Sequence, residues 1–290
     1  MFVGGCNDLL PLFEIAELES LHMRLQGTNP DPNWYSNPQN INPFPFPFIY
    51  HQLPVDRFDL SGPPEFSFAY MGRESFSAVW SEVNRLKTRG GYTRLYIHGT
   101  MGYGKSHILA VLAGLLSRSG KRTVYMPDCR ELLGDMVSYL QSALLCAFAD
   151  PSSSHRRDKI RAFKSQEDIH DFCRTQSQPF YFIVDQKNAL EIEGANMDAA
   201  TNSTKQTAQQ FLSQLTAMHY TITSASANYR TALHMAKKQT GERKIPMMGG
   251  MSEVSKHSSQ ALIFSSSSST RDTGGDETVV APSRGQSAHF

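Results

Sequence analysis

The sequence has few cysteines, almost no net charge and no long apolar run. Its four cysteines (Cys6, Cys129, Cys146 and Cys173) are widely spaced and form no C-x-x-C pair. This spacing argues against a zinc cluster or a disulfide framework and favours a reducing compartment. Lys and Arg number 28 against 27 Asp and Glu, a net charge of +1. No overall field therefore favours nucleic acid or an anionic membrane.

Signals for export or membrane insertion are also not recognisable. The segment MFVGGCNDLL has neither the basic start nor the continuous apolar stretch of a secretory signal. The longest apolar stretch falls far short of the ~20 residues that span a bilayer. The ten histidines show no H-E-x-x-H spacing, so no metal site of that type is expected. We expect an intracellular protein, cytoplasmic or nuclear, without membrane contact.

What the sequence does contain is a phosphate-loop pattern. Residues 99–106 read GTMGYGKS and fit G-x-x-x-x-G-K-[ST] at every fixed position. An apolar run at 95–97 precedes them and a mostly apolar run at 107–112 follows, which is the strand–loop–helix context that the pattern requires. The residues expected to bind the nucleotide here are Gly99, Gly102, Tyr103, Gly104, Lys105, Ser106 and His107.

The fixed positions of this loop have physical reasons. Backbone N–H groups of a glycine-rich loop turn towards a phosphate, and the next helix points the positive end of its dipole there. Gly99 and Gly104 fit positions that need positive φ or leave no room for a side chain. Lys105 can reach the β- and γ-phosphates, and the Ser106 hydroxyl is the expected magnesium ligand. A glycine-rich turn that merely precedes a helix is the alternative interpretation.

A second magnesium group is expected at the end of another apolar run. FYFIVD ends in Asp185, and a strand-end carboxylate holds magnesium in phosphate-loop proteins; an Asp that only ends the strand is the alternative. Gln186 follows, where many ATP-hydrolysing proteins have Glu, and it can orient a water but cannot accept its proton. Glu191 and Glu193 are candidate bases or surface carboxylates. We predict Lys105, Asp185 and Gln186 as catalytic residues, and Ser106 and Asp185 as metal ligands.

Strand-like and helix-like runs alternate along the chain. Strands are expected at 94–98, 123–126, 180–184 and 220–224, and helices at 9–25, 75–86, 131–148, 205–218 and 229–238, with another ending at Cys173. Apolar strands that alternate with helices predict an α/β fold with a mostly parallel sheet covered on both faces. Ligands of such sheets bind beyond the carboxyl ends of the strands.

Composition divides the chain into three parts. Residues 1–65 hold a helix and an irregular arm rich in Pro and Asn, residues 66–253 the nucleotide-binding domain, and residues 254–290 a Ser-rich tail expected to be disordered. The aromatic residues of the arm could pack on the domain.

The segment YMGRE, at residues 70–74, precedes the phosphate loop and FYFIVD. In this order the three segments resemble the AAA+/STAND branch of P-loop ATPases. The resemblance implies a three-layer P-loop NTPase fold, with Gly72 and Arg73 near the adenine. The polar end of the strand at 220–224 is then a γ-phosphate sensor or, equally, a helix cap; its residues are Thr223, Ser224, Ser226 and Asn228.

A narrower resemblance covers about residues 66–253. LYIHGTMGYGKSHILAVLA, VYMPDCRELL and FYFIVDQKNAL are similar to the ATPase domain of Crinkler-type (Crinkler/retrotransposon-hot-spot-like) proteins. The resemblance implies that helical segments, and often a toxin domain, follow, and it makes Gln186 a family feature. MFVGGCNDLL does not resemble that family's LFLAK-type segment, and a Ser-rich tail follows the domain, so a truncated effector is one interpretation.

The sequence therefore predicts an ATP-binding protein that hydrolyses ATP slowly with Mg²⁺ and acts with an unknown protein partner or with itself. No N-K-x-D string for guanine is present, which favours adenine. No arginine finger is assigned, although Arg230 and Arg243 are candidates. One alternative is a nucleotide-dependent interaction module without turnover. Another is a small-molecule kinase, which would need an acceptor pocket and an arginine-rich lid.

Overall fold

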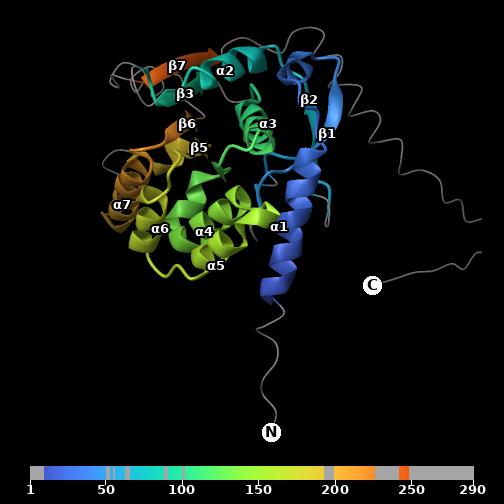
Figure 1. Ribbon diagram of the computed structural model, residues 1–290. Coiled ribbons are helices and arrows are strands. Elements are labelled where there is room, and N and C mark those ends of the chain that lie inside the picture. The colour runs from blue at the N-terminus through green and yellow to red at the C-terminus, as the bar shows by residue number, and fades with distance from the viewer. Residues whose placement is uncertain are drawn as a thin grey trace, which may run out of the picture.

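The computed structural model describes residues 10–49, 53–54, 56–62, 66–87, 91–99, 102–192, 199–225 and 242–247. It shows an α/β fold around a five-stranded sheet (Figure 1). The strands are β3 (Arg94–Gly99), β4 (Thr123–Met126), β5 (Tyr181–Val184), β6 (Tyr220–Ser224) and β7 (Glu242–Met247). They lie in the order β4-β5-β6-β3-β7, and every neighbouring pair is parallel. The predicted parallel sheet is confirmed.

Burial explains why four of the strands could be predicted and β7 could not. All four residues of β4 are buried, and β3, β5 and β6 are almost as fully covered, as expected for parallel strands packed on both faces. β7 reads ERKIPM, and only Met247 in it is buried. Its proline is tolerated because β7 lies at the edge of the sheet, where one side of the strand needs no ladder bonds.

The described helices differ from the predicted ones in their bounds, and two helices lie where one ending at Cys173 was expected. They are α1 (Leu10–Gln26), α2 (Ser75–Val83), α3 (Lys105–Arg118), α4 (Met136–Ala147), α5 (Ser154–Arg161), α6 (Gln166–Arg174) and α7 (Ala199–Leu215), with 3₁₀ turns η1 (Pro32–Ser36), η2 (Cys129–Leu133), η3 (Pro151–Ser153) and η4 (Lys187–Leu190). The helix expected from 131 begins at Met136, because Gly134 ends η2 and the Asp135 side chain caps α4 by accepting the Ser138 N–H.

The proline-rich part of the chain is not wholly irregular. β1 (Ile41–Pro45) pairs antiparallel with β2 (Ser67–Met71) in a separate two-stranded sheet. β1 accommodates Pro43 and Pro45 because a strand of a two-stranded sheet always has one unpaired side. Helix α1 contacts α3 and α4 (Figure 1). These contacts attach the first described part of the chain to the body of the fold.

The hydrophobic core includes residues from both sides of the domain boundary expected at residue 65. Phe44, Phe46 and Phe58 are each 2% exposed or less and belong to the same cluster as the strands of the large sheet. A Cβ atom added at Gly114 in α3 would stand 2.6 Å from the Phe44 ring. The bare backbone of Gly114 is therefore what lets the Phe44 ring lie against α3.

Several predictions concern parts of the chain outside the described residues. These are the helix at 229–238, the tail at 254–290, and the side chains of Glu193, Ser226, Asn228 and Arg230. Within the described residues, no helix combines the length and the apolar character needed to cross a membrane.

Candidate functional site

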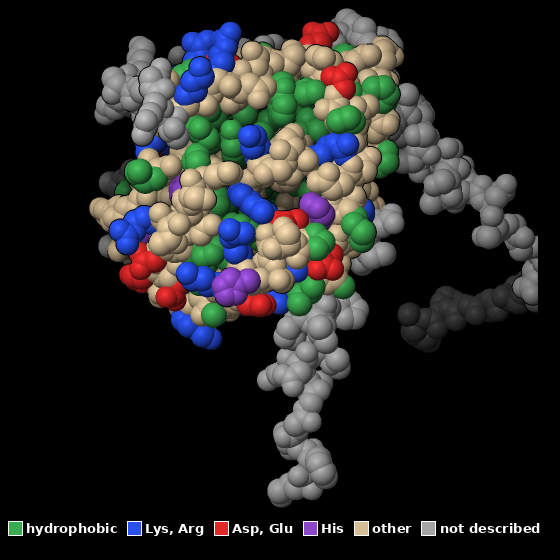
Figure 2. Space-filling view, viewed as in Figure 1, with side chains coloured by type: hydrophobic (Ala, Val, Ile, Leu, Met, Phe, Trp, Pro, Cys, Tyr) green, Lys and Arg blue, Asp and Glu red, His purple; other side chains and the backbone are tan. Residues whose placement is uncertain are grey.

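A cavity of about 740 Å³ opens where the phosphate-loop segment and the end of β5 meet. This is the carboxyl edge of the parallel sheet, where ligands of such folds bind. Its lining residues are Asp56, Arg57, Arg73, Gly102, Gly104, Lys105, Ser106, His107, Arg130, Asp185, Gln186, Asn188, Ala189 and Lys205. Five basic side chains therefore face two carboxylates. Basic side chains, with acidic and histidine side chains beside them, border a hollow near the middle of the face in Figure 2.

The glycines of the loop adopt backbone conformations that other residues avoid. Gly102 and Gly104 have φ of 85° and 72°, and Gly99 has φ of 151°. A Cβ atom at Gly99 would stand 2.1 Å from the Met247 carbonyl oxygen of β7. Gly104 accepts the Ile108 N–H at 3.0 Å and so starts α3. Both positions therefore have the positive φ and the lack of room for a side chain that the sequence predicted.

The side chains after the loop divide into those near the cavity and those packed in the core. Lys105 is 6% exposed, and its Nζ donates to the Gly99 carbonyl oxygen at 3.0 Å. Burial lowers its pKa, and the charge of Asp185 opposes part of that shift. Ser106 is half-buried and lines the cavity. Tyr103 is half-buried and is not among the cavity-lining residues.

His107 lines the cavity but also belongs to an aromatic cluster. Its ring lies 4.7 Å from the Phe58 ring and 5.4 Å from the Phe68 ring, centroid to centroid. Burial, followed by the charges of Arg73 and Arg57, lowers its pKa to about 4. At neutral pH the imidazole is therefore uncharged, so His107 adds no positive charge to the cavity.

Arg73 lies against the phosphate loop. A Cβ atom at Gly104 would come 2.3 Å from the Arg73 Cζ atom. Within the described residues its buried Nε has no hydrogen-bond partner, and burial lowers the pKa of the guanidinium. A largely buried cation that pairs with no carboxylate in the described part of the chain favours the binding of an anion.

Gly72, the neighbour of Arg73, has a packing role. Its N–H donates to the Asn40 carbonyl oxygen at 2.9 Å, and a Cβ atom there would stand 2.0 Å from the Asn37 carbonyl oxygen. Gly72 is not among the residues that line the cavity. The YMGRE segment therefore contributes the Arg73 side chain to the cavity, and Gly72 lets the backbone pass close to Asn37.

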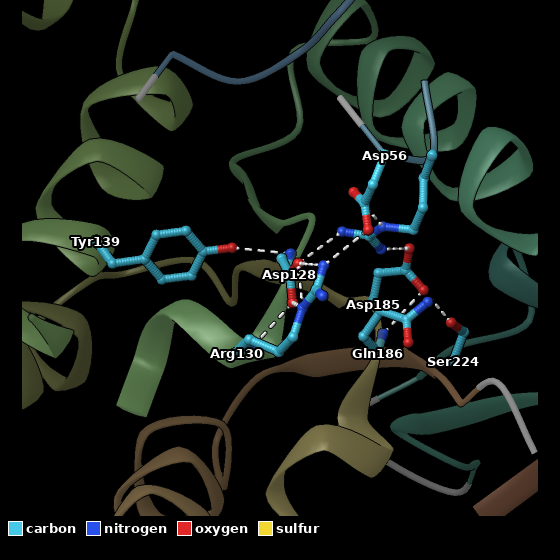
Figure 3. A network of polar contacts seen from close by, with 8 residues as sticks. Asp56, Asp128, Arg130, Tyr139, Asp185, Gln186 and Ser224 are labelled. Atoms are coloured by element: carbon cyan, nitrogen blue, oxygen red, sulfur yellow. Dashed lines mark hydrogen bonds and ion pairs between the residues drawn. The ribbon is translucent and has the colours of Figure 1, made fainter. Parts of the chain in front are cut away.

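Asp185 lies at the centre of a buried polar network (Figure 3). Its side chain is 1% exposed. Oδ1 accepts the Gln186 N–H at 2.9 Å and the Ser224 hydroxyl, and Oδ2 accepts Nη1 of Arg57 at 3.1 Å. The expected strand-end carboxylate is thus present at the cavity, bound to a guanidinium.

Arg57 and Asp128 are site residues that the sequence analysis missed. Nη2 of Arg57 donates to Oδ2 of Asp128 at 3.0 Å. Asp128 also accepts the Arg130 side chain at 2.8 Å, and its N–H donates to the Tyr139 hydroxyl at 3.0 Å (Figure 3). Asp128 lies two residues after the buried strand β4, whereas Asp185 directly follows β5, so a weaker strand-end signal was available for Asp128. Arg57 carried no such signal, because it lies 128 residues from Asp185.

Two further predicted groups lie close to Asp185. Gln186 has φ of 58°, the left-handed conformation that few residues other than glycine adopt, and its side chain lines the cavity. Ser224 ends β6, which stands between β3 and β5 in the sheet. The polar strand end therefore lies between the loop and the carboxylate, while Thr223 points its hydroxyl at the Leu95 carbonyl oxygen, 3.5 Å away.

Other candidates lie away from the cavity. Arg243, a candidate arginine finger, donates from Nε and from Nη2 to the Glu82 carboxylate, each at 3.2 Å. Glu191, a candidate base, is not a lining residue, and its carbonyl oxygen accepts Nζ of Lys205 at 3.0 Å. Lys205 itself lines the cavity and was not predicted.

A comparison with protein-family models and with curated proteins found no match to this chain. The resemblance to AAA+/STAND and Crinkler-type ATPases is therefore carried by the motifs alone.

Proposed function

We propose that this chain binds ATP with Mg²⁺ in the 740 Å³ cavity and hydrolyses it slowly. The observation that carries the proposal is the meeting, in one cavity, of positive-φ glycines at a helix start, a buried lysine, and an arginine that pairs with no carboxylate among the described residues. The cavity lies within the range of about 300–1,000 Å³ that small-molecule sites occupy. We further propose a three-layer P-loop fold of AAA+/STAND type. With right-handed connections, α3 and the helices α4 to α7 fall on opposite faces of the sheet.

The charges of the cavity suit a polyphosphate. Lys105 and Arg73 are both largely buried at the start of α3, where the helix dipole adds positive potential. A phosphate there would supply the counterion that Arg73 lacks among the described residues. Burying these cations is costly without an anion, so ligand binding is expected to be coupled to stability.

The side chains at the cavity also suit magnesium. Mg²⁺ binds proteins through one or two oxygen ligands and keeps most of its waters and substrate phosphates. Ser106 and Asp185 supply a hydroxyl and a carboxylate to the same cavity. Within the described residues no group of three or more His, Cys, Asp or Glu side chains could hold an ion by itself. When bound with ATP, magnesium would neutralise charge on the transferred phosphoryl group.

The chain's own residues would act mainly by positioning. Lys105 would bind the β- and γ-phosphates, and Gln186, beside Asp185, would orient the attacking water. No carboxylate follows Asp185 directly, so a proton acceptor is not supplied at that position. Orientation without a base is consistent with slow turnover, because phosphoryl transfer depends chiefly on positioning and charge stabilisation.

Binding of ATP to the purified chain tests the proposal. Calorimetry with MgATP should detect binding, and Lys105→Ala should weaken it about ten- to a hundredfold, as expected for loss of a charged hydrogen bond. Lys121→Ala is the matched control, because Lys121 is exposed beyond the other end of α3 and should leave affinity unchanged. Absence of ATP binding, or equal affinity for the Lys105 variant, would reject the proposal.

The second candidate is a nucleotide-dependent interaction module without turnover, such as a truncated Crinkler-type effector. The specific observation in its favour is the ion pair between Arg57 and Asp185, 3.1 Å long, which engages the carboxylate that would bind the metal. Phosphate release from MgATP separates the two: tight binding without release favours the module, and release abolished by Asp185→Asn favours the enzyme.

A further inference from the structure

Arg57 joins the two buried carboxylates of the site. Its guanidinium donates to Asp185 at 3.1 Å and to Asp128 at 3.0 Å. The side chains of the two acids are 1% and 6% exposed, and that of Arg57 is 15% exposed. Arg57 comes from a part of the chain outside the predicted nucleotide-binding domain, the segment 56–62.

The segment 56–62 is attached to the phosphate-loop helix. Phe58 is 1% exposed and packs on Phe46 and Phe68 with ring centroids 4.9 and 5.1 Å away. It also contacts His107, the residue after Ser106. Because Arg57 directly precedes Phe58, its guanidinium is held in the same cavity as Lys105.

The ion pair leaves both oxygens of Asp185 engaged. Oδ1 accepts from Gln186 and Ser224, and Oδ2 accepts from Arg57. While the guanidinium pairs with Oδ2, its positive charge opposes the approach of magnesium to the same oxygen. A phosphate oxygen is a partner of the same kind for a guanidinium, since both carboxylates and phosphates accept its paired donors.

We propose that Arg57 is a phosphate-sensing residue that the chain supplies to its own site. In the pairing described above it neutralises Asp185, and when a nucleoside triphosphate binds it transfers to the terminal phosphate and releases Asp185 towards the metal. A diphosphate lacks that terminal group and leaves Arg57 on Asp185. The inference rests on the proposed function, and it makes Arg57 the residue that distinguishes the triphosphate from the diphosphate.

The test is the dissociation constant for ADP divided by that for the non-hydrolysable triphosphate adenosine 5′-(β,γ-imido)triphosphate. Both constants are measured by calorimetry with Mg²⁺ on the full chain. Arg57→Met removes the ion-pair partner of Asp185 among the described residues and leaves Asp128 with Arg130 alone, so it is combined with Asp128→Asn to lower the buried negative charge by one. Arg57→Lys, a second variant, keeps the charge but not the paired donors. Arg243→Met is the matched control, since that arginine also pairs with a carboxylate, Glu82.

The wild-type chain should prefer the triphosphate. The ratio should fall about tenfold in the Arg57→Met and Asp128→Asn double variant, the size expected for a lost charged hydrogen bond. It should fall less in Arg57→Lys and stay unchanged in Arg243→Met. An unchanged ratio in both Arg57 variants, or tighter triphosphate binding, would overturn the inference while leaving nucleotide binding intact. Failure of the wild-type chain to bind either nucleotide would overturn the proposed function and the inference together.

Crystal structures of the wild-type chain keep the inference testable if the variants do not fold. The Arg57 guanidinium should lie within hydrogen-bond distance of the terminal phosphate in the complex with the Mg²⁺ triphosphate, and of Asp185 in the complex with MgADP. Arg57 paired with Asp185 in both complexes would overturn the inference.

Discussion

The guanidinium of Arg73 occupies the space that a side chain at Gly104 would need. A Cβ atom at Gly104 would lie 2.3 Å from the Arg73 Cζ atom, and Gly104 has φ of 72°. Glycine is therefore required at position 104 for two reasons: its backbone has positive φ, and the Arg73 guanidinium leaves no room for a Cβ atom. This contact joins the YMGRE segment to the phosphate loop.

Gly104→Ala should weaken nucleotide binding because the new methyl group displaces Arg73. Positive φ alone should cost about 1–2 kcal/mol of stability for Ala. Gly120→Ala is the matched control, since Gly120 has φ of 73° and open space where its Cβ would lie. Urea denaturation should show a similar loss in both variants, whereas calorimetry with MgATP should show weaker binding in Gly104→Ala alone. Equal affinity of the two variants would contradict this placement of Arg73.

Gly114→Ala should destabilise the fold although Ala is the better helix former. A Cβ atom at Gly114 would stand 2.6 Å from the Phe44 ring and 3.0 Å from Leu25. Overpacking of this kind costs about 1–3 kcal/mol, against a gain of about 1 kcal/mol in helix propensity. Adding Phe44→Leu should recover part of the loss, as measured by urea denaturation in a double-mutant cycle. Purely additive effects would mean that β1 does not pack on α3.

The sequence predicted best those features that are local. The loop glycines, Lys105 and Ser106 lie within one contiguous pattern, and their backbone conformations follow from it. Asp185 was predictable because a buried parallel strand is apolar until it ends. β7 escaped prediction because an edge strand with charged residues lacks the apolar run that identifies a buried one.

The ion pairs of the site could not be predicted in the same way. Arg57 reaches Asp185 and Asp128 across sequence separations of 128 and 71 residues. Such a partnership depends on how the segment 56–62 packs, and that packing rests on the tertiary contacts of Phe58 with Phe46, Phe68 and His107. Asp128 could have been predicted as a strand-end carboxylate from its position after β4. Its ion-pair partners could not have been predicted from the sequence.

Stability should fall as the pH drops from about 6.5 towards 4. His219 is 4% exposed, its Nδ1 accepts the Phe180 N–H at 3.2 Å, and burial lowers its pKa to about 4. Between these two pH values the unfolded chain binds the proton more readily, so protonation favours unfolding. The stabilisation is complete above pH ~6.5 and is lost as the pH falls through the folded pKa.

The variant His219→Gln should reduce this pH dependence. Urea denaturation at several pH values between 7 and 4 should show a smaller slope for the variant than for the wild-type chain, because glutamine does not titrate there. The remaining slope in the variant is expected from His107, whose pKa burial lowers to about 4, and from His98, whose pKa burial also lowers. Identical slopes for variant and wild-type would contradict the buried, neutral state of His219.

Two buried tyrosines near Asp128 should respond in opposite ways to the same substitution. The Tyr139 hydroxyl accepts the Asp128 N–H at 3.0 Å, whereas the buried Tyr125 hydroxyl has no hydrogen-bond partner among the described residues. Tyr139→Phe leaves a buried N–H unsatisfied and should cost about 1–3 kcal/mol. Tyr125→Phe removes a buried hydroxyl that has no partner among the described residues, so its effect on the free energy of unfolding should be neutral or stabilising. Chemical denaturation of both variants measures the difference, and an equal loss of stability in the two would mean that the Asp128 N–H is not held by Tyr139.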